Sequence, residues 1–258
     1  MLAAHPSVRV LGETTILPMH IEELEAELQR RRGGKSEVEF RDIIAKHAGR
    51  LLHAMQSAAA APETASGDVA AAAASPSASA FRIVDKTLRN YRSVAHILLM
   101  FPNATILHVK RGVMDTLFSC LKNRFTSPSM AYALNQDTLA QEFALYRQVM
   151  SSLVQVPPLG NILDVEYEQL VSHPEETMQA VLARLGLPWD DAVIGRRGAL
   201  RLLRQPTFHS ILGVMKPIFT DAMGAHEPYA DFFSQSLLRE ATAAEGQKSR
   251  SQIEVEAV

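Results

Sequence analysis

The chain has 258 residues, with 26 lysines and arginines against 28 aspartates and glutamates, a formal net charge of −2 and 47% hydrophobic residues. These values are typical of a globular chain, and the near-neutral charge excludes a protein that coats nucleic acid through a general basic field. The single cysteine, Cys120, excludes an internal disulfide, and no apolar run reaches the roughly 20 residues that a membrane span needs.

The first third of the chain predicts a short extended segment followed by two helices. Residues 5–18 mix β-branched and turn residues. Residues 20–32 and 38–56 carry apolar side chains at helical spacing, and the first of these stretches begins with glutamates and ends with arginines. Residues 57–80 are nearly all Ala, Ser, Pro and Gly, so we predict a disordered insertion that cannot bury enough surface to offset its ordering entropy.

The remainder alternates between strand and helix patterns. Strands are expected at 81–84, 104–110 and 161–167, and helices at 88–100, 115–124, 134–153 and 174–185. Such alternation predicts a parallel sheet with helices on its faces, an α/β fold. We therefore divide the chain into a domain formed by residues 1–56 and 81–240, the insertion at 57–80, and a flexible tail at 241–258.

Charged and polar residues follow the predicted strands. Lys86 follows the strand at 81–84, Arg111 follows the next one and is followed by Ser119, and Tyr167 ends the third. In open parallel sheets, ligands bind at the carboxyl ends of the strands. Each residue alone is more often a solvated or packing residue. Two cations and a hydroxyl together suit a phosphorylated ligand, because Arg can hold a phosphate through two hydrogen bonds and Lys adds a point charge.

A resemblance to a known family is carried by three stretches, in this order and spacing: F-R-I-V-D-K-T-L-R-N, F-P-N-A-T-I-L-H-V-K-R-G-V-M-D-T-L-F-S and I-L-D-V-E-Y-E-Q-L-V-S-H-P-E-E-T. They resemble sulfotransferases that use 3'-phosphoadenosine 5'-phosphosulfate (PAPS). The start, H-P-S-V-R-V-L-G-E-T-T-I-L-P, is similar to the tyrosylprotein sulfotransferases and to bacterial relatives with tetratricopeptide repeats. The resemblance covers about residues 1–187 and implies a P-loop NTPase-like sulfotransferase fold. The family's first strand and phosphosulfate-binding loop would precede Met1, so we expect both to be missing and turnover by this chain to be low.

The resemblance also implies roles for individual residues. Arg111 and Ser119 match the pair that binds the 3'-phosphate, and Tyr167 falls in a Y-E motif near the nucleotide. Lys86 matches the lysine beside the bridging oxygen, where it would stabilise charge on the leaving 5'-phosphate. Glu13 matches the glutamate that acts as general base on the acceptor. A phenol, with a pKa of about 10, needs such a base at neutral pH.

The implied activity is transfer of a sulfonate group from PAPS, as co-substrate, to a hydroxyl. The expected acceptor is a protein or peptide with a tyrosine near acidic residues, and no metal, nucleic-acid partner or transmembrane segment is expected. Two alternatives stay open: sulfation of a carbohydrate or another hydroxyl, and a nucleotide-binding remnant without catalysis. The sequence itself indicates no compartment, although the resemblance to the tyrosylprotein sulfotransferases implies the Golgi.

Overall fold

The computed structural model describes residues 1–31, 36–60, 81–123, 125, 127–154, 161–195 and 222–256. The chain forms two compact units. The first unit contains Met1–Ala104 and Pro174–Pro217, and the second unit contains Thr105–His173 and Ile218–Val258. The chain therefore leaves the first unit after Ala104 and returns to it at Pro174. Each unit has its own pair of parallel strands and its own apolar core.

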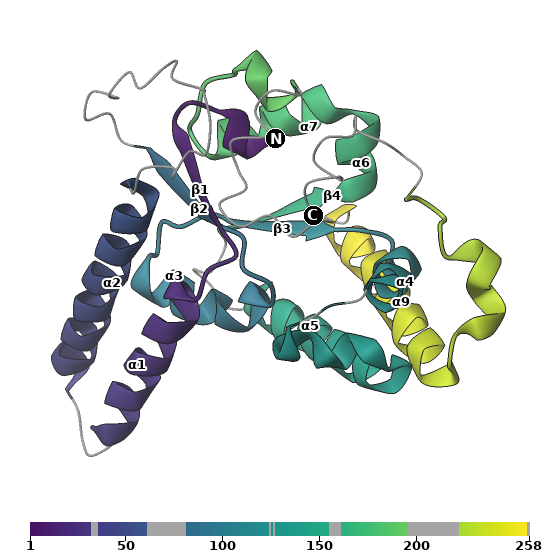
Figure 1. The fold of residues 1–258 in the computed structure, drawn as a ribbon, viewed down its shortest axis with the longest axis horizontal. Coiled ribbons are helices and arrows are strands. Elements are labelled where there is room, and N and C mark those ends of the chain that lie inside the picture. The colour runs from purple at the N-terminus through teal and green to yellow at the C-terminus, as the bar shows by residue number, and fades with distance from the viewer. Residues whose placement is uncertain are drawn as a thin grey trace, which may run out of the picture. The chain divides into compact units, whose positions relative to one another are not determined.

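Two parallel strands form the sheet of the first unit (Figure 1). Strand β1 spans Val8–Gly12 and strand β2 spans Arg82–Asp85, which confirms the two strand predictions in this part of the chain. The register shifts between Val10 and Gly12, so that Gly12 lies opposite Asp85. The two strands therefore end level with each other, and the segments that follow them leave the sheet at the same edge.

Two long helices of the first unit lie side by side (Figure 1). Helix α1 spans Ile16–Arg30 and begins four residues earlier than expected, and helix α2 spans Glu37–Ala60. Their facing sides form an apolar core that also takes in Met100. The buried members of this core on the two helices are Leu17, Ile21, Leu24, Ile43, Ile44 and Leu51. Leu52 is 42% exposed and does not belong to it, because it follows Leu51 by one residue and so points about 100° away around the helix.

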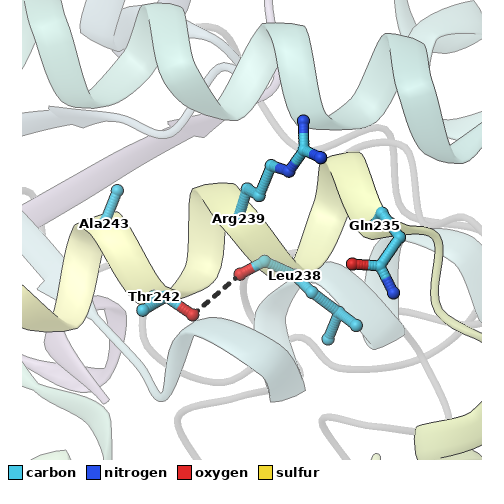
Figure 2. Close-up of a pocket in the computed structure, with 5 residues that line it drawn as sticks. All are labelled: Gln235, Leu238, Arg239, Thr242 and Ala243. Carbon is cyan, nitrogen blue, oxygen red and sulfur yellow. Dashed lines mark hydrogen bonds between the residues drawn. The ribbon is translucent and has the colours of Figure 1, made fainter.

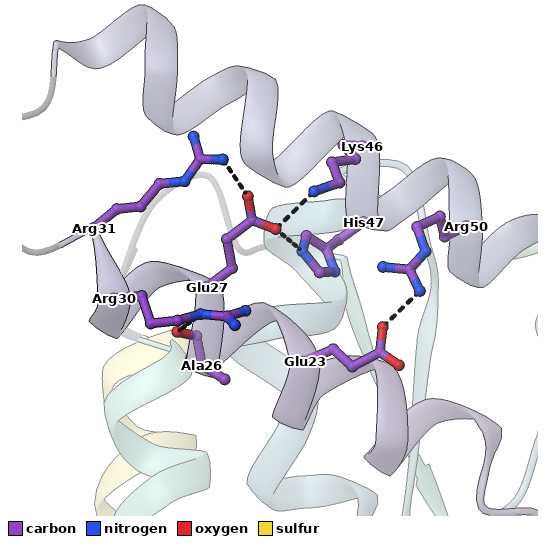
Figure 3. Close-up of polar contacts among 8 residues, drawn as sticks. All are labelled: Glu23, Ala26, Glu27, Arg30, Arg31, Lys46, His47 and Arg50. Atoms are coloured by element: carbon purple, nitrogen blue, oxygen red, sulfur yellow. Dashed lines mark hydrogen bonds and ion pairs between the residues drawn. The ribbon is translucent and has the colours of Figure 1, made fainter.

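A buried carboxylate joins the same two helices (Figure 3). Glu27 of α1 accepts hydrogen bonds from Lys46 Nζ at 2.8 Å and from the ring of His47 at 2.9 Å, both on α2. Arg31 contributes a further ion pair at 2.9 Å. The Lys46 and His47 hydrogen bonds lower the pKa of Glu27 to about 2, against the opposing effect of burial. This polar contact was not predicted, because the glutamates of α1 look alike in the sequence.

The rest of the described first unit consists of short elements. The helix predicted at 88–100 is a 3-10 turn at Asn90–Ser93 followed by helix α3, Val94–Met100. Helix α7, Pro174–Arg184, confirms the helix predicted at 174–185, and Gly186 follows it at φ +65°, a conformation that commonly ends helices. Helix α2 runs four residues into the predicted insertion at 57–80, and residues 61–80 lie outside the described part of the chain.

The second unit also contains two parallel strands (Figure 1). Strand β3 spans Ile106–Lys110 and strand β4 spans Ile162–Glu166, in an unbroken register that ends with Lys110 opposite Glu166. On this pair of strands, Asp164 accepts hydrogen bonds from His108 at 2.8 Å and from Lys110. Burial acts to raise the pKa of Asp164, but the two hydrogen bonds outweigh it and lower the pKa to about 2.

Helices of the second unit enclose a separate core. Helix α4 spans Val113–Lys122, α5 spans Gln136–Val154, α6 spans Tyr167–Ser172 and α9 spans Gln235–Glu256. The core is formed by Val113, Leu117, Leu139, Ala140, Phe233, Leu237 and Ala241. Helix α9 runs through the start of the segment predicted as a flexible tail at 241–258, and Ala241 is buried in the core. The boundary expected at 241 therefore falls inside a packed helix.

These elements confirm the α/β class with parallel strands and flanking helices. Within the described residues the strands form two pairs. No helix in the described part of the chain is long and apolar enough to cross a lipid bilayer.

Candidate functional site

The strand ends of the first unit bring together Glu13 and Lys86, the two predicted catalytic residues. Glu13 directly follows β1 and Lys86 directly follows β2, and the Lys86 N–H donates to the Gly12 carbonyl at 3.1 Å. The Lys86 ammonium lies 2.6 Å from Glu13 Oε1. Their side chains are 65% and 47% exposed, respectively. Exposed ion pairs add little stability, so this pair can open when a substrate offers other partners.

A hydrogen-bond network around Asp85 fixes the two loops that carry these residues. Asp85 Oδ1 accepts from the Thr87 N–H at 3.0 Å and from Asn90 Nδ2 at 2.6 Å, while Oδ2 accepts from the Thr14 hydroxyl at 3.2 Å. The Thr14 N–H donates in turn to the Thr87 hydroxyl at 3.1 Å. The loop after β1 is thereby tied to the loop after β2. Sequence reasoning missed this role, although Asp side chains in turns often accept from the backbone N–H two residues on, as Asp85 does from Thr87.

The strand ends of the second unit bring together Arg111 and Tyr167, two of the predicted nucleotide-binding residues. Arg111 follows β3, and Tyr167 follows β4 as the first residue of α6 rather than the last residue of the strand. The Arg111 guanidinium lies 5.1 Å from the centre of the Tyr167 ring, within range of a cation–π interaction. Next to Tyr167, Glu168 accepts a hydrogen bond from the Gly112 N–H at 2.8 Å. Both residues of the Y-E motif therefore hold the loop that carries Arg111.

The Arg111 guanidinium has an incomplete set of partners. One Nη donates to the Ala222 carbonyl, and Nε is buried with no hydrogen-bond partner among the described residues. No carboxylate in the described part of the chain forms an ion pair with Arg111. A partly buried cation without a counter-charge is energetically unfavourable, and a phosphate held by two hydrogen bonds would relieve this cost. The surroundings of Arg111 therefore fit an anionic ligand.

Ser119 lies on α4, two helical turns after Arg111. Its hydroxyl lies 3.4 Å from Asn123 Nδ2. Burial raises the pKa of the Cys120 thiol, next to Ser119, and outweighs the positive charge of Arg111, which acts to lower it. No hydrogen bond joins Ser119 to Arg111 among the residues that the structure describes, and the binding of one phosphate by both remains a prediction.

Asp115 is a further acidic residue of the second unit whose role sequence reasoning missed. It lies in the first turn of α4, is 5% exposed, and accepts hydrogen bonds from Gly224 and His226. Its partners are more than 100 residues away along the chain, so no local pattern could have revealed them. Of the predicted site residues, Glu13 and Lys86 lie at the strand ends of the first unit and Arg111 and Tyr167 at those of the second, while Ser119 lies on α4.

A hollow of about 430 Å³ lies along one side of α9 and contains none of the predicted site residues (Figure 2). The described residues that line it belong to this one helix: Gln235, Leu238, Arg239, Thr242 and Ala243. The Thr242 hydroxyl is already engaged with the Leu238 carbonyl at 3.0 Å. The described residues of the hollow offer no pair of groups for acid–base or nucleophilic chemistry, and we place the candidate site at the strand ends.

Comparisons with known proteins point to one family. A model of the sulfotransferase family matches residues 1–191. The protein-tyrosine sulfotransferase of Drosophila melanogaster is 29% identical over 194 residues, which cover 75% of this chain and 36% of that protein. Protein-tyrosine sulfotransferase A of Caenorhabditis elegans is 28% identical over 196 residues, which cover 75% of this chain and 47% of that protein. The chain thus spans less than half the length of these two curated relatives.

Among solved structures, the sulfotransferase domain from the Synechococcus PCC 7002 olefin synthase superimposes with a TM-score of 0.56. The match covers 95% of this chain and 87% of that domain at 14% sequence identity, so the likeness concerns the fold. The family model, in contrast, matches the sequence itself over most of its length. This chain belongs to the sulfotransferase family.

Proposed function

We propose that this chain transfers a sulfonate group from PAPS to the hydroxyl of a protein tyrosine. Membership of the sulfotransferase family supports the transfer, and the names of the two curated relatives support tyrosine as the acceptor. The observation that carries the donor assignment is the Arg111 guanidinium, which is partly buried, stacked on Tyr167 and without a carboxylate partner among the described residues.

The residues around Arg111 fit the 3'-phosphate of such a donor. The Tyr167 ring lies against the guanidinium, the Ala222 carbonyl takes one of its N–H groups, and the buried Nε–H has no described partner. A 3'-phosphate would provide an acceptor and a negative charge that the described residues around Arg111 do not supply. Ser119 would add a hydroxyl donor from α4.

Glu13 and Lys86 would act on the reacting groups. In the transfer, the phenolic oxygen forms a bond to sulfur while the bond from sulfur to the bridging oxygen of the 5'-phosphate breaks. The Glu13 carboxylate accepts the phenolic proton, and the Lys86 ammonium stabilises the negative charge on the departing phosphate oxygen. Their exposed ion pair separates so that each can take its new partner.

A single-turnover assay with donor labelled in the sulfonate group tests this proposal. The enzyme is mixed in excess with the labelled donor and a peptide in which one tyrosine is flanked by acidic residues. We expect label on the tyrosine peptide and none on the same peptide with phenylalanine. The Glu13→Gln variant should transfer on the order of 10²-fold more slowly, the range lost when a general base is removed.

Glu22→Gln provides the matched control, because Glu22 is an exposed glutamate of α1 and loses the same charge. This control should transfer at the wild-type rate. Label on an oligosaccharide but not on the peptide would contradict the tyrosine acceptor. A donor that binds without any transfer would contradict the enzyme assignment and favour a nucleotide-binding protein without turnover.

A further inference from the structure

A turn at residues 222–226 is fixed to the start of α4 by the carboxylate of Asp115. Asp115 Oδ2 accepts a hydrogen bond from the Gly224 N–H at 2.8 Å. Asp115 Oδ1 accepts from the His226 N–H at 3.2 Å and from the His226 ring Nδ1 at 2.7 Å. Because Asp115 is only 5% exposed, these three donors from a single turn replace most of its hydration.

The same turn also reaches Arg111. The Ala222 carbonyl accepts a hydrogen bond from one Arg111 Nη. Just after the turn, the ring of Tyr229 stacks on that of Phe118, a residue of α4, with 4.8 Å between ring centres. The segment from Ala222 to Tyr229 is therefore attached to Arg111 and to two positions on α4. We call residues 222–226, with these attachments, the clasp.

We propose that Asp115 is a positioning residue for nucleotide binding. By holding the clasp, it keeps the Ala222 carbonyl on one edge of the Arg111 guanidinium and leaves Nε free to donate to a 3'-phosphate. This inference rests on the proposed function, because it assumes that Arg111 binds that phosphate. It adds a residue that touches no ligand and acts through Ala222.

The physical basis is preorganisation of a long side chain. A free Arg side chain loses rotamer entropy when it is ordered, and a ligand that has to order it binds more weakly as a result. Here the Tyr167 ring lies against the guanidinium and the Ala222 carbonyl holds one of its N–H groups before any ligand arrives. A neutral carbonyl leaves the positive charge uncompensated, so the clasp orients Arg111 without replacing the phosphate.

The test compares two ligands that differ only in the 3'-phosphate. Affinities for adenosine 3',5'-bisphosphate and for adenosine 5'-monophosphate are measured by calorimetry, and their ratio reports the contribution of the 3'-phosphate. We expect Asp115→Asn to lower this ratio about tenfold, the loss expected for one hydrogen bond to a charged group, with the monophosphate affinity unchanged. Hydrogen exchange should accelerate at residues 222–232, while the amides of α4 stay protected.

Two further variants support the interpretation. His226→Ala removes one of the three donors to Asp115 and should lower the ratio in the same direction by a smaller factor. Asp231→Asn is the matched control, since Asp231 is an exposed residue of the 3-10 helix at Glu227–Phe232 and undergoes the same change of charge. We expect this control to leave the ratio unchanged.

Each other outcome has a definite meaning. A wild-type protein that does not prefer the bisphosphate would overturn the role of Arg111, and with it this inference. A normal wild-type preference that Asp115→Asn leaves unchanged or increases would overturn the role of Asp115 alone. Asp115→Asn could instead expose the amides of α4 and weaken the binding of both ligands equally. In that case the His226→Ala variant provides the test, and an unchanged affinity ratio in that variant refutes the role of the clasp in positioning Arg111.

Discussion

The carboxylate of Glu27 connects α1 and α2 through charge as well as through hydrogen bonds. Lys46 and His47 donate to it, Arg31 forms a further ion pair with it, and its pKa falls from an ordinary 4.5 to about 2. A carboxyl group with a lowered pKa in the folded state stabilises that state above its unfolded pKa, and the contribution disappears as the pH falls through the folded value. The relevant window is therefore pH 4.5 to 2.

We predict that Glu27→Gln lowers the midpoint temperature of unfolding at pH 7, because the amide carries no charge for Lys46 and Arg31. The difference from the wild type should narrow as the pH falls from about 4.5 towards 2, where the wild-type carboxylate also becomes neutral. Thermal unfolding followed by circular dichroism across this range measures both effects. Glu22→Gln, at an exposed site on the same helix, should show a much smaller difference. A Glu27→Gln difference that does not change with pH would show that charge is not the cause.

For single residues, sequence reasoning pointed to those that directly follow a strand. It missed the residues whose hydrogen bonds hold the neighbouring loops in place. Lys86, Arg111 and Tyr167 could be proposed from the sequence pattern because their position depends only on where a strand ends, whereas Glu13 was proposed only through the family resemblance. Asp85 and Asp115 could not be assigned, because their roles depend on partners that folding brings together. The Asp85 network joins two loops more than 70 residues apart, and Asp115 binds a turn more than 100 residues away.

At the scale of elements, the end of β1 depends on Gly12. This residue has φ +76° and follows the register shift that brings it opposite Asp85. A Cβ at this position would meet no atom within 4 Å, so the requirement for glycine comes from the backbone conformation and not from lack of space. The conformation sets the direction in which the chain leaves the strand towards Glu13.

We predict that Gly12→Ala destabilises the protein by about 1–2 kcal/mol, the cost of a left-handed conformation for a residue with a Cβ. It should also slow sulfonate transfer, because Glu13 is the next residue. Urea unfolding and the single-turnover assay measure the two effects. Gly49→Ala is the matched control, for which we expect the opposite change in stability. Gly49 lies inside α2 with open space around it, and alanine there should stabilise the protein by about 0.5–1 kcal/mol. Equal effects at both sites would contradict the conformational explanation.

Whether a segment forms a helix or a strand was easier to predict than where that helix or strand ends. Every described strand was expected from its apolar and β-branched pattern, and α1, α2, α4, α5 and α7 were expected from helical spacing. Helix α9 was not, because most of its residues are polar and, among its described side chains, the buried ones are Leu237 and Ala241. Packing of these two side chains against α4 and α5 holds the first half of the helix, which local composition cannot show.

At the scale of the whole molecule, the alternating pattern predicted parallel strands but not the division of the chain into two units. A local pattern cannot show that the chain returns to the first unit at Pro174. That return depends on contacts such as the hydrogen bond between the His5 ring and the Pro188 carbonyl, at 3.0 Å and 183 residues apart. Because each unit encloses its own core, a substitution that destabilises one core should first disturb the structure at the strand ends of the same unit.

We predict that Leu51→Ala and Leu237→Ala affect different parts of the protein. Both leucines are fully buried, Leu51 in the first core and Leu237 in the second, and each truncation should cost about 2–5 kcal/mol. Leu237 packs in the same core as Val113 and Leu117 of α4. Its truncation should therefore accelerate amide exchange in the second unit and reduce the preference for adenosine 3',5'-bisphosphate over the 5'-monophosphate.

Leu51→Ala serves as the matched comparison, because it removes the same atoms from an equally buried site in the other unit. It should accelerate exchange in α1 and α2 and leave the preference for the 3'-phosphate intact. Hydrogen exchange followed by mass spectrometry, together with calorimetry, separates the two responses. If both variants accelerate exchange throughout the chain and weaken the binding of the bisphosphate equally, the units unfold as one, and Arg111 depends on the core between α1 and α2 as much as on the core of its own unit.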